Sequence, residues 1–304
     1  MNKHKKYDAS SIEVLEGLEP VRRRPGMYIG GTDNASMHHL FSEVIDNAMD
    51  EAVANFASFI EVKVEKDNTI SVYDNGRGIP IDPHPSFPNK SALEVIMTTL
   101  HAGGKFSNKV YQTSGGLHGV GISVVNALSE FVEVEVYRDK KTYHQTFSKG
   151  HPTSKLKEIK KKPNKKGTKI SFKPDTEIFG TDNNFNYKKL YDFSKSKAYL
   201  FAGVEIRWFC DSEISKEENI PENDIFKFSQ GLIDLVQNEV DEKMSLLSEI
   251  FSGNREKDKS NLSFEWAINW SLGTNTFLNS YCNTVPTPQG GTHELGLRGG
   301  LLKA

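Results

Sequence analysis

The stretch SGGLHGVGISVVNALS, residues 114–129, places four glycines directly before a run of apolar residues with helical spacing. Glycine loses more conformational entropy on folding than other residues, so a cluster of glycines indicates that a ligand approaches the main chain closely. Exposed N–H groups and the dipole at the start of a helix favour negative charge. The stretch therefore predicts an anion-binding loop, followed by a helix that begins near Val120.

Two common phosphate loops are excluded by their spacing. A P-loop needs GxxxxGK[ST], but Lys105 is followed by Phe106, and Thr99 stands where the first glycine is required. The dinucleotide fingerprint GxGxxG is absent as well, because the glycines at 116, 119 and 121 run in the opposite order, GxxGxG. Taken alone, the loop is equally compatible with a surface turn.

Composition limits the class of protein. The chain has 304 residues, of which 37% are hydrophobic and 26% charged, as in globular proteins of one large or two ordinary domains. A formal net charge of -2 gives no overall attraction to DNA or membranes, so any DNA contact must be local. Cys210 and Cys282 lack metal-site spacing, and no signal peptide or membrane span is recognisable. These features predict a cytoplasmic protein without a membrane partner.

The segment from Leu40 to Val53 has apolar residues at helical spacing. A row of polar residues is expected on the opposite face of this helix: His39, Glu43, Asn47, Asp50 and Glu51. A solvated face is the ordinary explanation for such a row. However, Asn is a mediocre helix former, whereas its amide oxygen is a good ligand for Mg²⁺. The row therefore makes a metal and phosphate site a second interpretation.

Strands and turns surround this helix in the sequence. Alternating apolar residues predict a hairpin over 60–64 and 70–72, and the hairpin ends in the turn YDNGRGIP, residues 73–80. Asp74 in this turn forms either an ordinary Asx-turn or a ligand contact. Ser91 and Glu94 have capping-box spacing, which predicts the start of another helix. Further strands are expected in FVEVEVY (131–137) and TKISFKP (168–174), giving a layered fold of strands and helices.

Four motifs occur in order along the chain: ExxxN at 43–47, DxGxG at 74–78, GxxGxG at 116–121 and GT at 167–168. This set resembles the GHKL family of ATPases. The stretches YDASSIEVLEGLEPVRRRPGMYIGGTD (7–33), HAGGKF (101–106) and 114–129 are similar to the B subunits of bacterial type II topoisomerases. GLEPVRRRPGMYIGGT (17–32) and KFSNKVYQTSGGLHGVG (105–121) resemble the topoisomerase IV branch more than the gyrase branch.

The resemblance implies a fold and a domain organisation. The expected fold is α+β: the GHKL (Bergerat) two-layer α/β sandwich with a mixed sheet, followed by an incomplete α/β transducer domain. The ATP-binding domain with an N-terminal dimerisation arm is expected over 1–220, and the first part of the transducer over 221–304. The polar stretch CDSEISKEENIPENDIFK (210–227) supports a boundary near 220, and VPTPQGGTHELGLRGGL (285–301) resembles the transducer.

The resemblance also implies an ATPase with ATP and Mg²⁺ at one site. Glu43 is expected to be the general base that activates water, and His39 to hold that carboxylate. Asn47 is the expected Mg²⁺ ligand, and Asp74 is expected to accept the adenine amino group. The full set expected to bind the nucleotide is Tyr7, Asn47, Asp50, Asp74, Arg77, Gly78, Ile79, Pro80, Ile96, Lys105, Gly115, Gly116, Leu117, His118, Gly119, Val120, Gly121 and Thr168. Aminocoumarin-type inhibitors are expected at Asp74, Arg77, Arg138 and Thr168.

The partners implied by the resemblance are a second copy of the chain, a topoisomerase A-type subunit and DNA. ATP binding is expected to close a homodimer in which the arm carrying Tyr7 reaches the other subunit. The arginines at 22–24 either face DNA or form surface ion pairs. The family's transducer "QTK" lysine and its cleavage domain do not occur before Ala304, so slow hydrolysis and no DNA cleavage are expected of this chain alone. A GHKL histidine kinase and a chaperone-type clamp are the alternatives from other classes.

Overall fold

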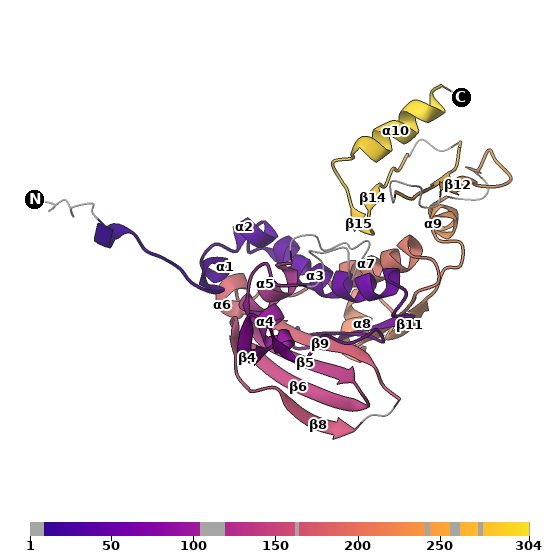
Figure 1. The fold of residues 1–304 in the computed structure, drawn as a ribbon. Helices are drawn as coiled ribbons and strands as arrows, with labels where there is room; N and C mark the ends of the chain where they lie inside the picture. The colour runs from indigo at the N-terminus through magenta and orange to yellow at the C-terminus, as the bar shows by residue number, and fades with distance from the viewer. Residues whose placement is uncertain are drawn as a thin grey trace, which may run out of the picture.

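A mixed β-sheet with helices on one face forms the body of the molecule (Figure 1). The computed structural model describes residues 9–103, 119–161, 164–240, 244–255, 262–272 and 276–303. The predicted site residues Tyr7, Lys105 and Gly115–His118 lie outside the described residues. The layered α+β fold expected from the sequence is confirmed.

The described residues form one nine-stranded sheet with the order β11-β10-β1-β2-β9-β5-β6-β7, and β8 also pairs with β6. The pair of β1 and β10 is parallel and the other pairs are antiparallel, so the sheet is mixed. Its strands are β1 (Phe59–Val64), β2 (Ile70–Asp74), β5 (Ser129–Arg138), β6 (Lys141–Ser148), β7 (His151–Pro152), β8 (Lys157–Lys161), β9 (Gly167–Pro174), β10 (Glu205–Cys210) and β11 (Asn223–Phe226). A separate short pair is formed by β3 (Pro83–His84) and β4 (Phe87–Ser91).

Helices cover one face of this sheet. They are α1 (Glu19–Arg23), α2 (Gly26–Ile29), α3 (Asn34–Val53), α4 (Ala92–Thr98), α5 (Gly121–Ala127), α6 (Thr176–Phe179), α7 (Tyr187–Leu200) and α8 (Ser212–Glu218). Within this layer α3 packs against α5, α7 and β2, and α7 packs against β10. The core between helices and sheet includes the fully buried Phe41, Phe172 and Trp208. The long helix α3 thus lies across the middle strands, where it can present side chains to the end of β2.

Local sequence signals account for these elements. In β1 the side chains of Ile60, Val62 and Val64 are buried and the intervening ones are not, as expected of a strand with one covered face. The predicted hairpin is present as the antiparallel pair of β1 and β2. The predicted start of α4 is also confirmed, because the Ser91 side chain accepts a 3.1 Å hydrogen bond from the N–H of Glu94.

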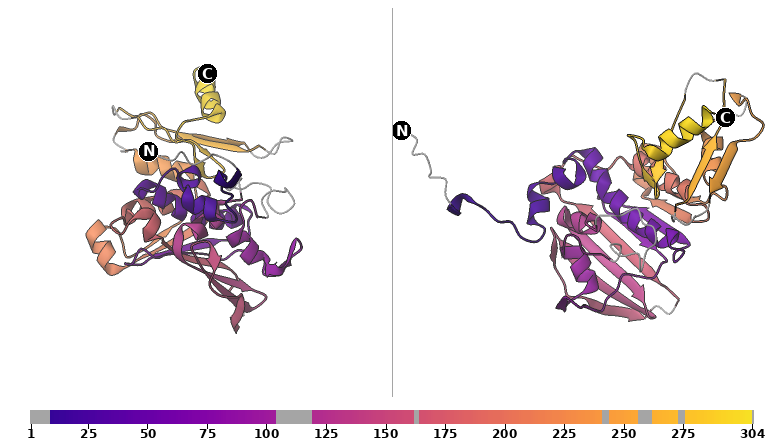
Figure 2. Two further views of the ribbon diagram at one scale, coloured as in Figure 1. Left: turned by 90° about the vertical axis from the view of Figure 1, so that its left-hand side faces the viewer. Right: turned by 45° about the horizontal axis from the view of Figure 1, so that its top comes forward.

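The N-terminal segment, which begins with the short 3-10 helix Ala9–Ser11, extends away from the body of the molecule (Figures 1 and 2). Ile12 and Val14 in this segment are 58% and 78% exposed. At the root of the segment Arg23 forms ion pairs with Glu13 at 2.8 Å and with Glu19 at 2.9 Å. The described part of the segment thus combines an ion pair beside α1 with exposed apolar side chains, as an arm that could reach a second molecule would.

Two of the arginines at 22–24 form polar contacts within the molecule, and DNA contact by this cluster stays a prediction. Arg22 donates to Asp175 and to the carbonyl of Ala127, both at 2.7 Å, and Arg23 forms the ion pairs described above. Asp175 is 1% exposed, so Arg22 has a structural role that anchors α1 to the end of α5. Arg24 is exposed.

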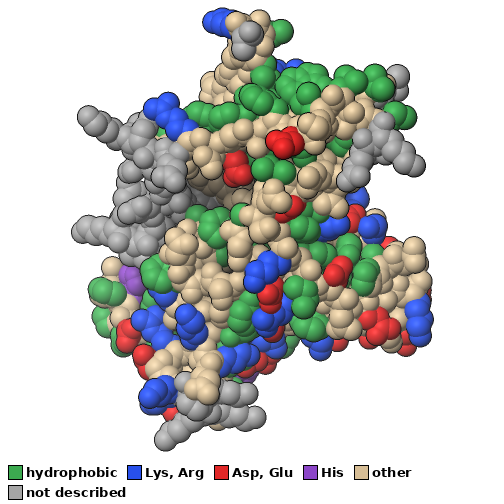
Figure 3. Space-filling view, turned by 90° about the vertical axis from the view of Figure 1, so that its right-hand side faces the viewer, with side chains coloured by type: hydrophobic (Ala, Val, Ile, Leu, Met, Phe, Trp, Pro, Cys, Tyr) green, Lys and Arg blue, Asp and Glu red, His purple; other side chains and the backbone are tan. Residues whose placement is uncertain are grey.

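Beyond the large sheet the chain forms a C-terminal part, residues 227–303. It contains α9 (Leu232–Glu239), the pair β12 (Phe251–Arg255) and β13 (Phe264–Ile268), the pair β14 (Tyr281–Cys282) and β15 (Val285–Pro286), and α10 (Thr292–Leu301). Figure 3 shows hydrophobic side chains gathered over the upper part of one face, and Phe251, Phe264 and Trp270 are among the exposed apolar residues of this part. β11, the last strand of the large sheet, ends at Phe226, and the boundary near residue 220 stays a prediction.

Among the described residues, no helix combines the length and the apolar character that crossing a membrane requires.

Candidate active site

The end of β2 places a carboxyl group inside the molecule. Asp74 is the last residue of β2, lies opposite Thr168 of β9, and is only 6% exposed. The N–H of Gly76 donates to Asp74 Oδ1 at 2.8 Å, and the N–H of Ile79 donates to Thr168 Oγ1 at 3.1 Å. The turn after β2 therefore brings four predicted site residues together: Asp74, Gly78, Ile79 and Thr168.

The two strands approach each other unusually closely at this point. Gly167, the first residue of β9, has φ +110°, and a β-carbon built on it would lie 1.9 Å from the carbonyl oxygen of Asp74. Only glycine fits this combination of backbone angle and contact. The GT motif is thus explained, because Gly167 allows the next residue, Thr168, to lie beside Asp74.

Burial changes the acid strength of Asp74. Loss of solvation raises the pKa of this carboxyl to about 7, the nearby Glu51 carboxylate adds to the effect, and the N–H of Gly76 opposes it. At neutral pH the group therefore exchanges between the acid and the carboxylate. A hydrogen bond donated by an amino group of a ligand would favour the ionised form of Asp74, since a carboxylate is a stronger acceptor than a carboxylic acid.

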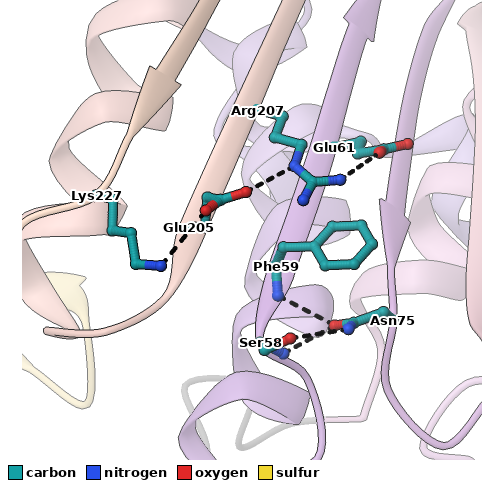
Figure 4. A network of polar contacts seen from close by, with 7 residues as sticks. All are labelled: Ser58, Phe59, Glu61, Asn75, Glu205, Arg207 and Lys227. Carbon is teal, nitrogen blue, oxygen red and sulfur yellow. Dashed lines mark hydrogen bonds and ion pairs between the residues drawn. The ribbon is translucent and has the colours of Figure 1, made fainter.

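Asn75, the residue after Asp74, fixes this turn to the backbone at the start of β1. Asn75 Oδ1 accepts hydrogen bonds from the N–H groups of Ser58 at 2.8 Å and Phe59 at 3.0 Å, and its Nδ2 donates to Ser58 Oγ (Figure 4). On the same uncovered face of the sheet, Arg207 lies over the Phe59 ring at 3.9 Å and pairs with Glu61 and Glu205. The sequence motifs do not identify Asn75 as a functional residue. The signal that could have found it is its position in a turn, between Asp74 and Gly76.

The C-terminal end of α3 reaches the same turn. Glu51 accepts from the backbone N–H, Nε and Nη2 of Arg77 at 2.9, 3.1 and 2.6 Å, and the guanidinium lies 3.8 Å from the centre of the Phe56 ring. Asp50 and Glu51 are only 2% and 9% exposed. The polar row is therefore not a solvated face along its whole length, because these two carboxylates at its end are buried.

The first part of the polar row stays accessible. His39 is exposed, whereas Glu43 and Asn47 are half-buried. Asn47 Nδ2 donates to the carbonyl of Glu43 at 2.8 Å, which orients the amide with Oδ1 as the atom that could bind a cation. A β-carbon built on Gly121, the first residue of α5, would lie 1.7 Å from Glu43 Oε2. The start of α5 and the Glu43 carboxylate are therefore in direct contact.

The remaining predicted residues within the described ranges lie at the end of β5, on α4, in the turn after β2 and at the start of α5. Arg138 at the end of β5 donates to the carbonyl of Gly78 at 3.2 Å, which places it beside the Asp74 turn. Ile96 lies on α4 and is half-buried, and Pro80 is exposed. Gly119, with φ +62°, and Val120 directly precede α5, as the sequence predicted for the start of this helix.

The side chains around Asn47 are compatible with Mg²⁺ as a bound cation. Among the described residues, no group of three His, Cys, Asp or Glu side chains could hold a metal ion. Mg²⁺ commonly uses one or two protein oxygens, with water and substrate phosphates filling its other positions. An oriented Asn47 amide oxygen next to a carboxylate fits that requirement.

Comparisons with known proteins agree with this fold. The family described as histidine kinase-, DNA gyrase B-, and HSP90-like ATPase matches residues 32–178, and the family described as DNA gyrase B matches residues 231–304. The B subunit of DNA topoisomerase 4 from Bartonella bacilliformis is 57% identical over 298 residues, which make up 98% of this chain and 43% of that protein. The chain thus spans less than half the length of this relative.

Two solved structures match as well. The ATP-binding domain of topoisomerase IV of Francisella tularensis, in complex with a small-molecule inhibitor, has 38% identity and a TM-score of 0.75, over 97% of this chain and 74% of that one. The 43K ATPase domain of Thermus thermophilus gyrase B, in complex with an aminocoumarin, has 36% identity and a TM-score of 0.78, over 93% and 70%.

The fold is that of a GHKL ATPase domain followed by part of a transducer domain, which implies that the chain binds ATP. The chain belongs to the B subunits of type II topoisomerases and comprises their ATPase region.

Proposed function

We propose that this chain is the ATP-operated gate of a topoisomerase IV B subunit, in which Mg·ATP binding closes a dimer for DNA strand passage. The observation that carries the proposal is the buried Asp74 carboxyl, which lies opposite Thr168 at the end of β2, beside the helix that carries Glu43 and Asn47. Similarity to the B subunit of a topoisomerase 4 supports this branch, and the gyrase B subunit is the second candidate.

Adenine is recognised at the Asp74 turn. The ionised Asp74 accepts a hydrogen bond from the amino group of adenine. This contact selects ATP over GTP, because guanine has a carbonyl oxygen at that position and cannot donate. The Thr168 hydroxyl, whose position is fixed by the N–H of Ile79, lies next to this contact. The backbone of Gly78, together with Ile79, Pro80 and Ile96, completes the pocket around the ring.

Hydrolysis takes place on the α3 side of the site. Glu43 removes a proton from the attacking water, and His39, one turn earlier on α3, holds that carboxylate. Asn47 supplies a protein oxygen to Mg²⁺, which neutralises charge on the phosphates when bound. Gly115 to Gly121 together with Lys105 surround the triphosphate, whose negative charge is favoured at the start of α5.

The entropic cost of ordering the phosphate loop and the N-terminal arm is the reason to expect that the dimer closes when nucleotide binds. Fixing the backbone of a loop and an arm costs about 1–2 kcal/mol per residue, and phosphate contacts and dimer burial must offset this cost. Nucleotide binding and dimerisation are therefore coupled, with Tyr7 of the arm reaching the partner's nucleotide. In the intact enzyme the chain acts with a topoisomerase A-type subunit and DNA. A cytoplasmic location stays a prediction.

Three measurements test the proposal. Calorimetry should detect binding of a non-hydrolysable ATP analogue, and sedimentation should show a dimer only with the analogue and Mg²⁺. The intact protein is then combined with a topoisomerase IV or a gyrase A-type subunit. Decatenation without negative supercoiling is expected. Negative supercoiling would favour the gyrase candidate, and the absence of nucleotide binding would contradict both.

A further inference from the structure

A lysine lies completely buried at the junction between the nucleotide-binding layers and the C-terminal part. The side chain of Lys197, near the end of α7, is 0% exposed. Burying an ammonium group is costly unless it is paired and hydrogen-bonded. The contacts of Lys197 are therefore the reason that it is tolerated at this position.

These contacts come from three elements. Lys197 Nζ forms a 2.6 Å ion pair with Asp46 Oδ1 on α3 and donates a 2.8 Å hydrogen bond to the carbonyl of Thr284. The ring of Phe193, one turn earlier on α7, lies 4.7 Å from the ammonium. In Figure 1, β15 and α7 lie next to each other, in agreement with the contact to Thr284. A single ammonium thus joins α3, α7 and the hairpin β14–β15.

The hairpin end of this connection has a strained conformation. Cys282 pairs with Val285, so Asn283 and Thr284 form a two-residue turn, with φ of +48° and +70°. Positive φ is expected of Asn in such turns, but it is an outlier for a β-branched residue such as Thr. Such a conformation persists only where surrounding contacts over-determine it, and the bond from Lys197 to the Thr284 carbonyl is one such contact.

The α3 end of the connection lies within the proposed active site. Asp46 directly precedes Asn47 and is one turn after Glu43. If the hairpin moved away, the buried ammonium would lose the Thr284 carbonyl as a partner, so the hairpin and α3 cannot shift independently at low cost. We propose that Lys197 is a positioning residue that links the β14–β15 hairpin to α3, so that the C-terminal part controls the placement of Glu43 and Asn47. This inference rests on the proposed function for the roles of Glu43 and Asn47.

The test compares three variants of the intact protein. Lys197→Met removes the connection and deprives the Asp46 carboxylate of its ammonium partner. It is compared with Asp46→Asn/Lys197→Met, in which both members of the buried pair are neutral. Lys188→Met on the same helix is the matched control, because Lys188 forms an exposed ion pair with Asp192 at 2.9 Å. Thermal melting confirms that each variant is folded.

Hydrogen exchange without nucleotide is the first readout, because it does not depend on the ATPase assignment. The neutral double variant is expected to exchange amides of residues 281–285 and of 43–47 about tenfold faster than the wild type, and the Lys188 variant to match the wild type. The second readout is ATP turnover, with kcat expected to fall about tenfold while the dissociation constant of an ATP analogue changes less than about threefold.

The outcomes distinguish a failure of the Lys197 link from a failure of the proposed function. Wild-type exchange at either segment in the folded double variant would overturn the proposed link, and so would faster exchange with an unchanged kcat. A wild-type protein that binds no ATP analogue would instead contradict the proposed function, while the exchange readout would still decide whether Lys197 connects the hairpin to α3.

Discussion

Gly121 lies against Glu43 so closely that a β-carbon at residue 121 would be 1.7 Å from Oε2 of the glutamate. The first residue of α5 and the middle of α3 are therefore in contact through a carboxylate that we propose to be the general base. Oε2 is the far end of a flexible side chain, so a larger residue at 121 would displace this oxygen rather than the backbone of α3.

Replacing Gly121 by alanine should therefore impair hydrolysis without unfolding the protein. We expect kcat for ATP to fall about tenfold to a hundredfold, as misplacement of a catalytic group by about 1 Å can cost. Nucleotide affinity is measured in parallel, because Gly121 also belongs to the loop that we propose surrounds the triphosphate. Gly296→Ala on α10 is the control, since nothing lies within 4 Å of a β-carbon there. An unchanged kcat in a folded Gly121→Ala protein would contradict the assignment of Glu43.

Glu43→Ala tests the same residue directly. Loss of a general base typically lowers the rate by about 10²–10⁴-fold, so hydrolysis should fall by that factor while ATP binding is retained. Steady-state turnover and equilibrium binding of an ATP analogue, measured on the same preparation, separate the two effects. A collapse of affinity would show that Glu43 binds the nucleotide instead of activating water.

Asp74→Asn should weaken adenine binding. The variant replaces a charged acceptor by a neutral amide, which costs about 1.5–3 kcal/mol for a hydrogen bond to a charged group. Calorimetry with an ATP analogue measures the difference. Equal affinities of the two proteins would exclude Asp74 as the adenine contact.

The raised pKa of Asp74 predicts a dependence of binding on pH. Burial raises this pKa from 3.8 to about 7, so the carboxyl is mainly protonated at pH 6 and mainly ionised at pH 8. If adenine binds the ionised form, the affinity of the wild type should rise about tenfold from pH 6 to pH 8 relative to Asp74→Asn, which corrects for titration of the phosphates. The same shift lowers folding stability as pH rises from about 4 to about 7, because the native state holds the proton more tightly than the unfolded state. Parallel pH profiles for the two proteins would contradict this behaviour.

Arg22 should contribute to stability rather than to DNA binding. Arg22→Met removes the 2.7 Å partner of Asp175, whose side chain is 1% exposed and which keeps Lys149 at 3.7 Å, so we expect a loss of about 1.5–3 kcal/mol in the free energy of unfolding. Arg23→Met is the control, because its ion pairs are exposed and contribute about 0–1 kcal/mol. Urea denaturation measures both. If Arg22→Met kept full stability but weakened DNA binding by the intact protein, the structural role would be wrong.

Much of the fold could be predicted because local signals agreed with the tertiary structure. The alternation in β1, the cap at Ser91 and the start of α5 each have a short-range cause. The motifs also identified the residues that meet at the Asp74 turn. In contrast, the burial of Asp50 and Glu51 depends on how α3 packs over the end of β2, and amphipathic periodicity within one helix does not contain that information.

Long-range polar contacts could not be predicted from the sequence for the same reason. Lys197 has no motif around it, and its partners Asp46 and Thr284 lie far away in the sequence. Glu51 was placed on the polar row, but its ion pair with Arg77 joins a helix to a distant turn. Such contacts follow from the topology of the sheet and helices and could be seen only in the folded structure.

A structure of this protein with a non-hydrolysable ATP analogue and Mg²⁺ tests the central claim most directly. We expect the adenine amino group within hydrogen-bond distance of the Asp74 carboxylate, and the Asn47 amide oxygen bound to the magnesium ion beside Glu43. Adenine bound away from Asp74, or magnesium held without Asn47, would contradict the proposed site.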